Sequence, residues 1–321
     1  MTTSDKPLVL LWIPEPAPYR QALERAGLDS RVETVSVPMA EEPAPDLLAR
    51  CEAMLAFRTG AGLLSRMPRL RWIQTITAGV EGWLALPDLP TAVTLTCARG
   101  THRVQMPENI LGALFLLTKS FGGIVLDQRE RRWRRRVSET LAGKTLGILG
   151  LGAVGQELAR KAEALEMTVI GTRRSPGPMP HVERVLGPQG TDEVLATSDF
   201  VLLLLPVTPE TRGFMNASRL KRMKPSAYLL NFGRGELVVD LDLVEAVKAR
   251  TIAGAVLDVF PTEPLPSEHP FWVTEGITVL PHIGGLHPTR DHIVAGLFVE
   301  NVERFLEGRA LRETVDRARG Y

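Results

Sequence analysis

The sequence predicts an α/β protein built from two doubly wound parallel sheets. The chain has 321 residues, more than a single hydrophobic core usually serves. Two regions alternate short apolar runs with amphipathic helical stretches, the pattern of parallel strands covered by helices on both faces. Between them, residues 145–174 read as a complete strand, glycine-rich turn, helix and second strand. We therefore expect two α/β domains, with this βαβ unit in the second.

The first region has the periodicity of a small, complete α/β domain. Its strands are expected at residues 8–13, 32–37, 53–57, 71–75 and 92–97, and its helical segments at residues 19–26, 47–51, 62–67 and 80–86.

The next segment combines an apolar helix with a basic run. Residues 106–119 are strongly apolar, with Pro107 suited to a first turn, and this predicts a helix buried between the two domains. Residues 129–136 contain six arginines and Trp133. A nucleic-acid contact is an alternative, but the run is isolated in a balanced chain, so we favour a solvated helix and loop.

The second region continues the sheet that the βαβ unit begins. We expect strands at residues 199–205, 227–232, 253–259 and 277–280, and helices at residues 217–223 and 241–249. A final helix at residues 289–306 is long enough to cross back to the first domain. In a doubly wound sheet, ligands bind beyond the carboxyl ends of the strands.

Composition restricts the possible partners. The formal net charge of +1 predicts no general attraction to nucleic acid or to a membrane surface. Cys51 and Cys97 both lie in apolar surroundings and are expected to be buried thiols, so neither a disulfide nor a metal site is predicted. The apolar run at residues 8–13 is too short for a signal peptide, and no run reaches the length of a membrane span, so we expect a cytoplasmic protein.

The glycine-rich turn predicts a dinucleotide site. Gly150 permits a tight turn, Gly152 lets backbone N–H groups approach a pyrophosphate, and Gly155 lets the helix pack close to the strand. The expected strands are residues 146–149 and 167–172, with the helix at residues 156–165. A purely structural turn is the less favoured alternative.

The end of the second strand favours NADP(H). NAD-binding units usually place an acidic residue there for the ribose hydroxyls. This chain instead has Thr172, Arg173, Arg174 and Ser175, which offer cationic and hydroxyl groups to a 2′-phosphate. The alternative is a pair of solvated arginines. We expect NADP(H) to be preferred and NAD(H) to be possible.

Three loops after the last strands carry the candidate catalytic groups Arg234, Glu263 and His282. Each has an ordinary interpretation as a surface arginine, a loop carboxylate or a capping imidazole. Together they provide a proton donor, a carboxylate partner and a cationic anchor, which a hydride transfer to the ketone of an anionic substrate requires.

At this point the chain resembles the D-2-hydroxyacid dehydrogenases, a family that includes glyoxylate/hydroxypyruvate reductases, phosphoglycerate dehydrogenase and formate dehydrogenase. The resemblance rests on residues 70–81 (LRWIQTITAGVE), the turn from Gly150 to Gly155, residues 205–211 (LPVTPET), and the three loops in the family's order. It implies a flavodoxin-like substrate domain at residues 1–100 plus 288–321 and a Rossmann cofactor domain at residues 101–287. A cleft between them would close about hinges at residues 97–106 and 281–288.

The resemblance also implies residue roles. Arg234 would bind the substrate carboxylate and carbonyl, His282 would be the general acid/base, and Glu263 would orient it and favour its charged form. Asp258 would contact the nicotinamide carboxamide. The substrate carboxylate would also meet the backbone of Ala78, Gly79 and Val80, and the cofactor would lie against Gly150, Gly152, Ala153, Val154, Gly155, Thr172, Arg173, Arg174, Ser175, Pro206, Thr211, Phe232, Gly233, Asp258 and Gly284.

The chain departs from the family pattern at two places, Met106-Pro-Glu108 where Ala-Glu is common and His282-Ile-Gly-Gly where Pro-His-Ile-Ala is common. Neither changes the three catalytic side-chain types. Both leave the size of the substrate open, because residues around Phe57, Arg58, Met106 and Gly285 would shape the substrate pocket.

The resulting hypothesis is an NADPH-preferring reductase that converts glyoxylate, hydroxypyruvate or a similar 2-oxoacid to the D-2-hydroxyacid. By resemblance, a homodimer is expected. The alternatives are another family activity, such as a phosphoglycerate-type dehydrogenase, and a non-catalytic dinucleotide-sensing regulator on the same fold.

Overall fold

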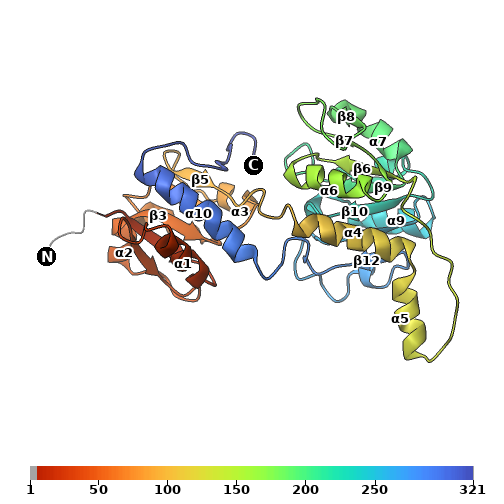
Figure 1. Cartoon of the computed structure of the whole chain (residues 1–321), viewed down its shortest axis with the longest axis horizontal. Coiled ribbons are helices and arrows are strands. Elements are labelled where there is room, and N and C mark those ends of the chain that lie inside the picture. The colour runs from red at the N-terminus through yellow and green to blue at the C-terminus, as the bar shows by residue number, and fades with distance from the viewer. Residues whose placement is uncertain (1–5, 321) are drawn as a thin grey trace. The chain divides into compact units, whose positions relative to one another are not determined.

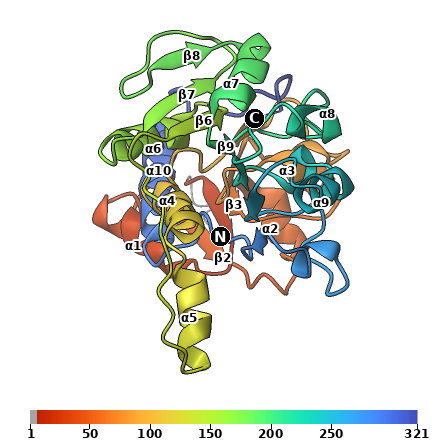
Figure 2. The same ribbon diagram turned by 90° about the vertical axis from the view of Figure 1, so that its right-hand side faces the viewer.

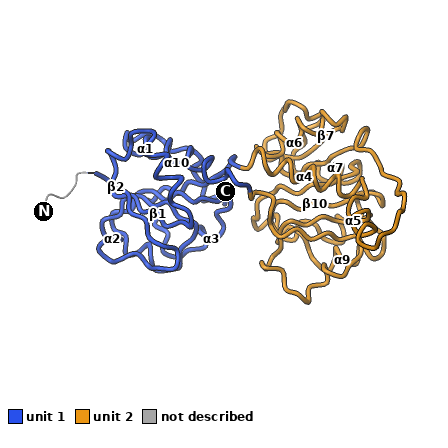
Figure 3. The backbone as a smooth tube through the Cα atoms, turned by 60° about the horizontal axis from the view of Figure 1, so that its bottom comes forward, with its two compact units in different colours: residues 1–101, 287–321 blue, residues 102–286 orange. Residues whose placement is uncertain are grey.

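The computed structural model describes residues 6–320. The chain divides into two compact units, unit 1 (Met1–Thr101 with His287–Tyr321) and unit 2 (His102–Leu286), which are coloured separately in Figure 3. Each unit holds one sheet, and every strand pair in both sheets is parallel. The predicted fold class is confirmed.

Unit 1 contains the five-stranded sheet. Its strand order, β2-β1-β3-β4-β5, is the flavodoxin-like order. The strands are β1 (Leu8–Trp12), β2 (Glu33–Ser36), β3 (Cys51–Ala56), β4 (Trp72–Thr75) and β5 (Thr94–Thr96).

Alternate residues of these strands feed two apolar layers. Leu8 and Leu10 face α2 (Pro45–Arg50), the short turn η1 (Leu64–Arg66) and α3 (Glu81–Leu84). Val9 and Leu11 face α1 (Ala17–Arg25) and the C-terminal α10 (Arg290–Leu306). The two layers explain why these strands read as continuous apolar runs. Cys51 and Cys97 are free and buried, as predicted.

Unit 2 contains the seven-stranded sheet in the order β12-β11-β10-β9-β6-β7-β8, with the reversal of a Rossmann sheet between β6 and β9 (Figure 1). The strands are β6 (Thr145–Leu149), β7 (Thr168–Thr172), β8 (Arg184–Leu186), β9 (Phe200–Leu203), β10 (Tyr228–Asn231), β11 (Gly254–Leu257) and β12 (Ile277–Val279).

Helices cover both faces of this sheet. One layer packs α4 (Gln105–Thr118) and α6 (Ala153–Glu163) on Leu146, Ile148 and Leu202. The other packs Leu149, Val201 and Leu203 against α7 (Thr191–Thr197), α8 (Ala217–Leu220) and α9 (Asp240–Lys248). Short turns η2 (Pro188–Gly190), η3 (Gly235–Leu237) and η4 (Pro270–Trp272) complete the unit.

Helix α5 (Phe121–Arg129) extends away from the sheet of unit 2 (Figures 1 and 2). The chain returns without regular structure over residues 130–144, and Arg136 Nε donates to Asp127 Oδ2 at 2.8 Å. The solvated helix and loop that we predicted for residues 129–136 take the form of a helix that ends at Arg129 and an exposed loop that holds the other arginines. Within residues 6–320, no single helix could cross a membrane by length and hydropathy, although α4 and α5 pass that test as a pair bent by 65°.

Several predicted elements are shorter than the sequence suggested. Cys51 begins β3 and does not end a helix, residues 62–67 form only η1, and residues 80–86 form only the four-residue α3. Strand β8 and helix α7 were not predicted from the sequence. Strand β8 has three residues that pair only with β7, so its existence depends on tertiary pairing.

Candidate functional site

The candidate residues of unit 2 follow the strands at one edge of its sheet. Gly150 follows β6, Arg173 follows β7, and Arg234 follows β10, while Glu263 and His282 lie in the loops after β11 and β12. Because all these strands are parallel, their carboxyl ends meet at the same edge.

The glycine turn is built by backbone contacts that exclude side chains. The N–H groups of Gly150 and Leu151 donate to Thr172 O at 3.1 and 2.8 Å, joining the ends of β6 and β7. Gly150 has a φ of +104°, and a Cβ there would lie 2.8 Å from the carbonyl carbon of Leu204. At Gly155, a Cβ would meet Ile148 Cγ2 at 3.4 Å, which is an ordinary van der Waals contact. The backbone therefore requires glycine at position 150, whereas position 155 has room for a Cβ.

Gly152 is different, because a Cβ there would meet nothing within 4 Å. It is the N-cap of the eleven-residue α6, and no side chain caps that helix end. The backbone around Ala153 and Val154 therefore begins a helix whose N-terminal dipole favours an anion. This open turn fits the pyrophosphate of a dinucleotide.

The end of β7 presents two arginines. Thr172 is buried, whereas Arg173, Arg174 and Ser175 are exposed, and Arg173 N donates to Leu186 O at 3.0 Å. A hydrogen bond from the Thr208 hydroxyl lowers the pKa of Glu210, and the charge of Arg174 contributes to that shift. The arginines can meet a phosphate, and Glu210 sets a negative charge near one of them.

The loop after β9 is closed by threonine side chains. Thr211 Oγ1 donates to Pro206 O at 2.7 Å, and Thr208 N donates to Thr211 Oγ1 at 2.7 Å. These bonds give the segment that contains Pro206 and Thr211 a fixed turn beside the glycine loop, since a Cβ on Gly150 would contact Leu204 in the same segment.

Arg234 is positioned by a buried amide that the sequence analysis missed. Asn231, 1% exposed, donates from Nδ2 to Arg234 O at 2.8 Å and accepts from Gly233 N at 3.1 Å. Arg234 Nη1 donates to Gly233 O at 2.8 Å. The missed signal was a polar residue ending an apolar strand, directly before Phe232, which is buried.

His282 and Glu263 are in contact, as the sequence led us to expect. His282 Nδ1 lies 2.6 Å from Glu263 Oε2, and the imidazole side chain is 53% exposed. The other carboxylate oxygen of Glu263 accepts from Phe260 N at 2.9 Å. This leaves Nε2 of His282 as the ring nitrogen that can exchange a proton with a bound ligand.

The loop that carries His282 is held from two sides. Asp258, 1% exposed, accepts from Ile283 N and Gly284 N at 2.8 Å each. Burial raises the pKa of Asp258, and these two N–H groups oppose the rise. A Cβ on Gly284 would lie 2.6 Å from Asp258 Oδ2, so only glycine allows this approach. The contact of Asp258 with a nicotinamide stays a prediction.

Asn109 of α4 is a second residue that the sequence analysis missed. Its Nδ2 donates to Ile283 O at 3.0 Å and to Gly284 O at 3.2 Å. The two partners are more than 170 residues away along the chain. An isolated asparagine in an apolar helix was the available signal.

The three remaining predicted site residues lie in unit 1. Ala78, Gly79 and Val80 form the turn between β4 and α3, where Thr77 Oγ1 donates to Gly79 O at 2.8 Å. Their role in carboxylate binding stays a prediction.

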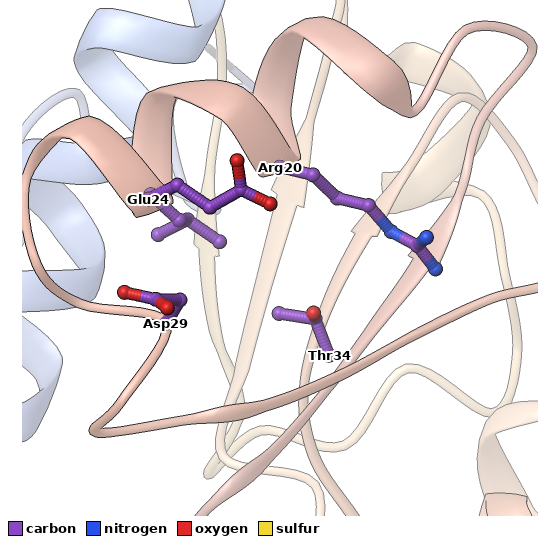
Figure 4. A pocket seen from close by; sticks show the side chains of 5 residues that line it. Arg20, Glu24, Asp29 and Thr34 are labelled. Carbon is purple, nitrogen blue, oxygen red and sulfur yellow. The ribbon is translucent and has the colours of Figure 1, made fainter.

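Unit 1 also has a small polar pocket beside α1 (Figure 4). Arg20 and Glu24 reach it from the helix, and Asp29 and Thr34 complete it from the following loop and β2. None of these residues belongs to the predicted sites.

Known proteins resemble this chain in sequence. Residues 111–284 match the family model described as D-isomer specific 2-hydroxyacid dehydrogenase, NAD binding domain. Glyoxylate/hydroxypyruvate reductase A of Serratia proteamaculans (strain 568) is 32% identical over 302 residues, which cover 92% of this chain and 95% of the relative.

Solved structures agree over almost the whole chain. A D-isomer specific 2-hydroxyacid dehydrogenase family protein from Aeromonas salmonicida subsp. salmonicida A449 superposes with a TM-score of 0.89 at 30% identity, covering 98% of this chain and 100% of that one. The NADPH-dependent glyoxylate/hydroxypyruvate reductase of Sinorhizobium meliloti, solved with NADP and sulfate, has a TM-score of 0.85 at 29% identity with the same coverage. The chain therefore belongs to the D-isomer specific 2-hydroxyacid dehydrogenase family.

Proposed function

We propose that this protein is an NADPH-preferring reductase that converts a small 2-oxoacid, such as glyoxylate or hydroxypyruvate, to the D-2-hydroxyacid. The observation that carries the proposal is the 2.6 Å contact between His282 Nδ1 and Glu263 Oε2. It lies at the sheet edge that also holds Arg234 and the glycine turn.

Each group has a chemical task in this reaction. The guanidinium of Arg234 binds the substrate carboxylate and polarises the neighbouring carbonyl. His282 Nε2 donates a proton to the carbonyl oxygen, while Glu263 orients the ring and stabilises its positive charge. When bound, the reduced nicotinamide supplies the hydride that the carbonyl carbon receives. The backbone of Ala78, Gly79 and Val80 is proposed to hold the carboxylate as well.

Two features support the cofactor assignment. Gly152 leaves open space at the N-terminus of α6, as a pyrophosphate needs. Arg173 and Arg174 are exposed after β7, where a 2′-phosphate would be held. A 2-hydroxyacid dehydrogenase from Xanthobacter autotrophicus Py2, 29% identical, was solved with NADPH. We infer that unit 2 is the cofactor domain and unit 1 the substrate domain.

The test is a turnover assay with purified protein. NADPH and NADH are each supplied with glyoxylate, hydroxypyruvate and phosphohydroxypyruvate, and the absorbance of the reduced nicotinamide and the chirality of the product are measured. We expect the highest kcat/KM with NADPH and an unphosphorylated oxoacid. A preference for the phosphorylated substrate would favour a phosphoglycerate-type enzyme. Tight NADPH binding without turnover would favour a dinucleotide-sensing regulator.

We also infer a cytoplasmic location, because both cysteines are free and buried and a reducing compartment suits them. Fractionation of cells that express the chain would test this inference.

The proposed homodimer is supported by helix α5. Phe121, Ile124 and Val125 are spaced as one helical face and are 58%, 42% and 50% exposed. Val125→Glu is expected to lower the molar mass measured by sedimentation equilibrium from that of a dimer to that of a monomer. Leu241→Glu changes an exposed leucine elsewhere in unit 2 and should leave the mass unchanged.

A further inference from the structure

The loop that carries Glu263 is attached at its far end to helix α9. His269 Nε2 lies 3.3 Å from Asp240 Oδ2, and both side chains are mostly buried. His269 Nδ1 accepts a hydrogen bond from Phe271 N at 3.4 Å. That acceptor role places a proton on Nε2, which can then donate to Asp240. Both ring nitrogens are therefore used to fix the imidazole.

Buried aromatic rings connect this pair to Glu263. The His269 ring packs edge-on against Phe271, with 4.5 Å between centroids, and Phe271 lies 6.2 Å from Phe260. Both phenylalanines are buried. Phe260 N donates to Glu263 Oε1 at 2.9 Å. A displacement of His269 would therefore shift Phe271 and, through it, Phe260. The backbone N–H of Phe260 is the group that holds Glu263 Oε1.

A second attachment lies next to Arg234. A Cβ on Gly235 would lie 2.0 Å from Phe260 C and 2.2 Å from Pro261 N. The backbone that leads to Glu263 therefore passes directly over the residue after Arg234. The segment from Arg234 to Asp240 and the loop from Phe260 to His269 meet at both of their ends.

We infer that Asp240 and His269 are positioning residues, which together with Gly235 fix the Glu263 loop relative to Arg234. In this way they set the distance between Arg234, which is proposed to bind the substrate, and Glu263, which contacts His282. Neither residue touches the reacting atoms in this inference, which rests on the proposed function. A misplacement of a catalytic group by about 1 Å can lower the rate by roughly 10²-fold. Loss of the contact between Asp240 and His269 should therefore have a measurable effect on turnover.

The experiment compares Asp240→Ala and His269→Ala with Asp242→Ala. Asp242 lies in the same first turn of α9, but its carboxylate accepts from Ala217 N at 2.7 Å, at the start of α8. Steady-state kinetics, NADPH dissociation constants and hydrogen–deuterium exchange over residues 260–272 are measured for each variant.

We expect kcat to fall on the order of tenfold in Asp240→Ala and His269→Ala, with an unchanged dissociation constant for NADPH. Exchange over residues 260–272 should become faster in these two variants and not in Asp242→Ala. The double variant should lose no more than His269→Ala, because Asp240 acts on the loop through its contact with His269. His269→Gln, which keeps a donor near Asp240, should recover part of kcat.

An unchanged kcat in both alanine variants, or an equal loss in Asp242→Ala, would overturn the inference. If Asp240→Ala does not fold, Asp240→Asn replaces it with the same expected direction. If the wild type reduces no oxoacid, the proposed function fails separately, and the exchange rates then decide alone whether the pair holds the loop.

Discussion

In unit 2, one aspartate at the amino ends of the strands and one at their carboxyl ends both accept hydrogen bonds from backbone N–H groups, but with different consequences. Asp199, before β9, accepts from Thr145 N at 2.8 Å and from Lys224 Nζ at 3.0 Å. Asp258, after β11, accepts from Ile283 N and Gly284 N, beside His282. Burial opposes ionisation at both, but its effect prevails only at Asp258, whose pKa is raised, whereas the pKa of Asp199 is lowered.

The comparison shows how one sheet separates structure from chemistry. At the amino edge, Asp199 is stabilised as a charge and joins the starts of neighbouring strands. At the carboxyl edge, a buried carboxylate is kept at a cost in desolvation because it holds a loop in place. A buried carboxylate with a high desolvation cost, at the carboxyl ends of the strands, therefore marks the functional side of the sheet.

The largest expected effect is at His282. His282→Asn should lower kcat by roughly 10² to 10⁴-fold, the usual contribution of a general acid, without weakening NADPH binding. The matched control is His181→Asn, which breaks another histidine–glutamate pair of unit 2, with 2.5 Å between His181 Nδ1 and Glu163 Oε2. Equal losses in the two variants would remove the distinction between the carboxyl edge and the rest of the unit.

The arginines after β7 should have the next largest effect. A charge-assisted hydrogen bond contributes about 1.5 to 3 kcal/mol, so Arg173→Ser with Arg174→Ser should weaken NADPH binding by roughly ten to a few hundred fold. NADH binding should change little, and Arg173→Asp should move preference towards NADH. Calorimetric titration with both cofactors measures this. The pair Arg131→Ser with Arg132→Ser serves as the control, and an unchanged cofactor ratio would contradict the NADP assignment.

Asp258→Asn tests the buried carboxylate at the functional edge. Ile283 N and Gly284 N donate to different oxygens of Asp258, and asparagine would place an NH2 group against one of these donors. One unsatisfied buried donor costs about 1 to 3 kcal/mol. We expect a lower free energy of unfolding in urea together with a lower kcat. Loss of stability with full kcat in the folded protein would mean that Asp258 does not position His282.

Asp199→Asn should have the smallest effect on turnover and should change mainly the pH dependence of stability. The folded-state pKa of Asp199 is below its usual value, so its contribution to stability is present above about pH 3.8 and is lost as the pH falls through the lowered pKa. Urea unfolding measured from neutral to acidic pH should therefore show a shallower loss of stability in the variant than in the wild type. Turnover at neutral pH should be unchanged, and a large loss of kcat would contradict the structural role.

The sequence by itself determined the two parallel sheets, because apolar runs such as Val201–Leu205 fit strands that are buried on both faces. It also determined the glycine turn, because the positive φ of Gly150 is a conformation that side chains rarely adopt. The three catalytic side-chain types could be selected because each follows a predicted strand, and parallel strands bring such loops to one edge.

Only the tertiary structure decided which groups meet. Asn109 and Asp258 hold the His282 loop from distant parts of the chain, and Asp240 meets His269 although helix α9 and strand β11 lie between them in the sequence. Strand β8 depends on its pairing with β7. The segment that follows α5 is held against that helix by the bond from Arg136 to Asp127. Local spacing contains no information on such contacts, since their free energy is realised only after the sheet has brought the segments together.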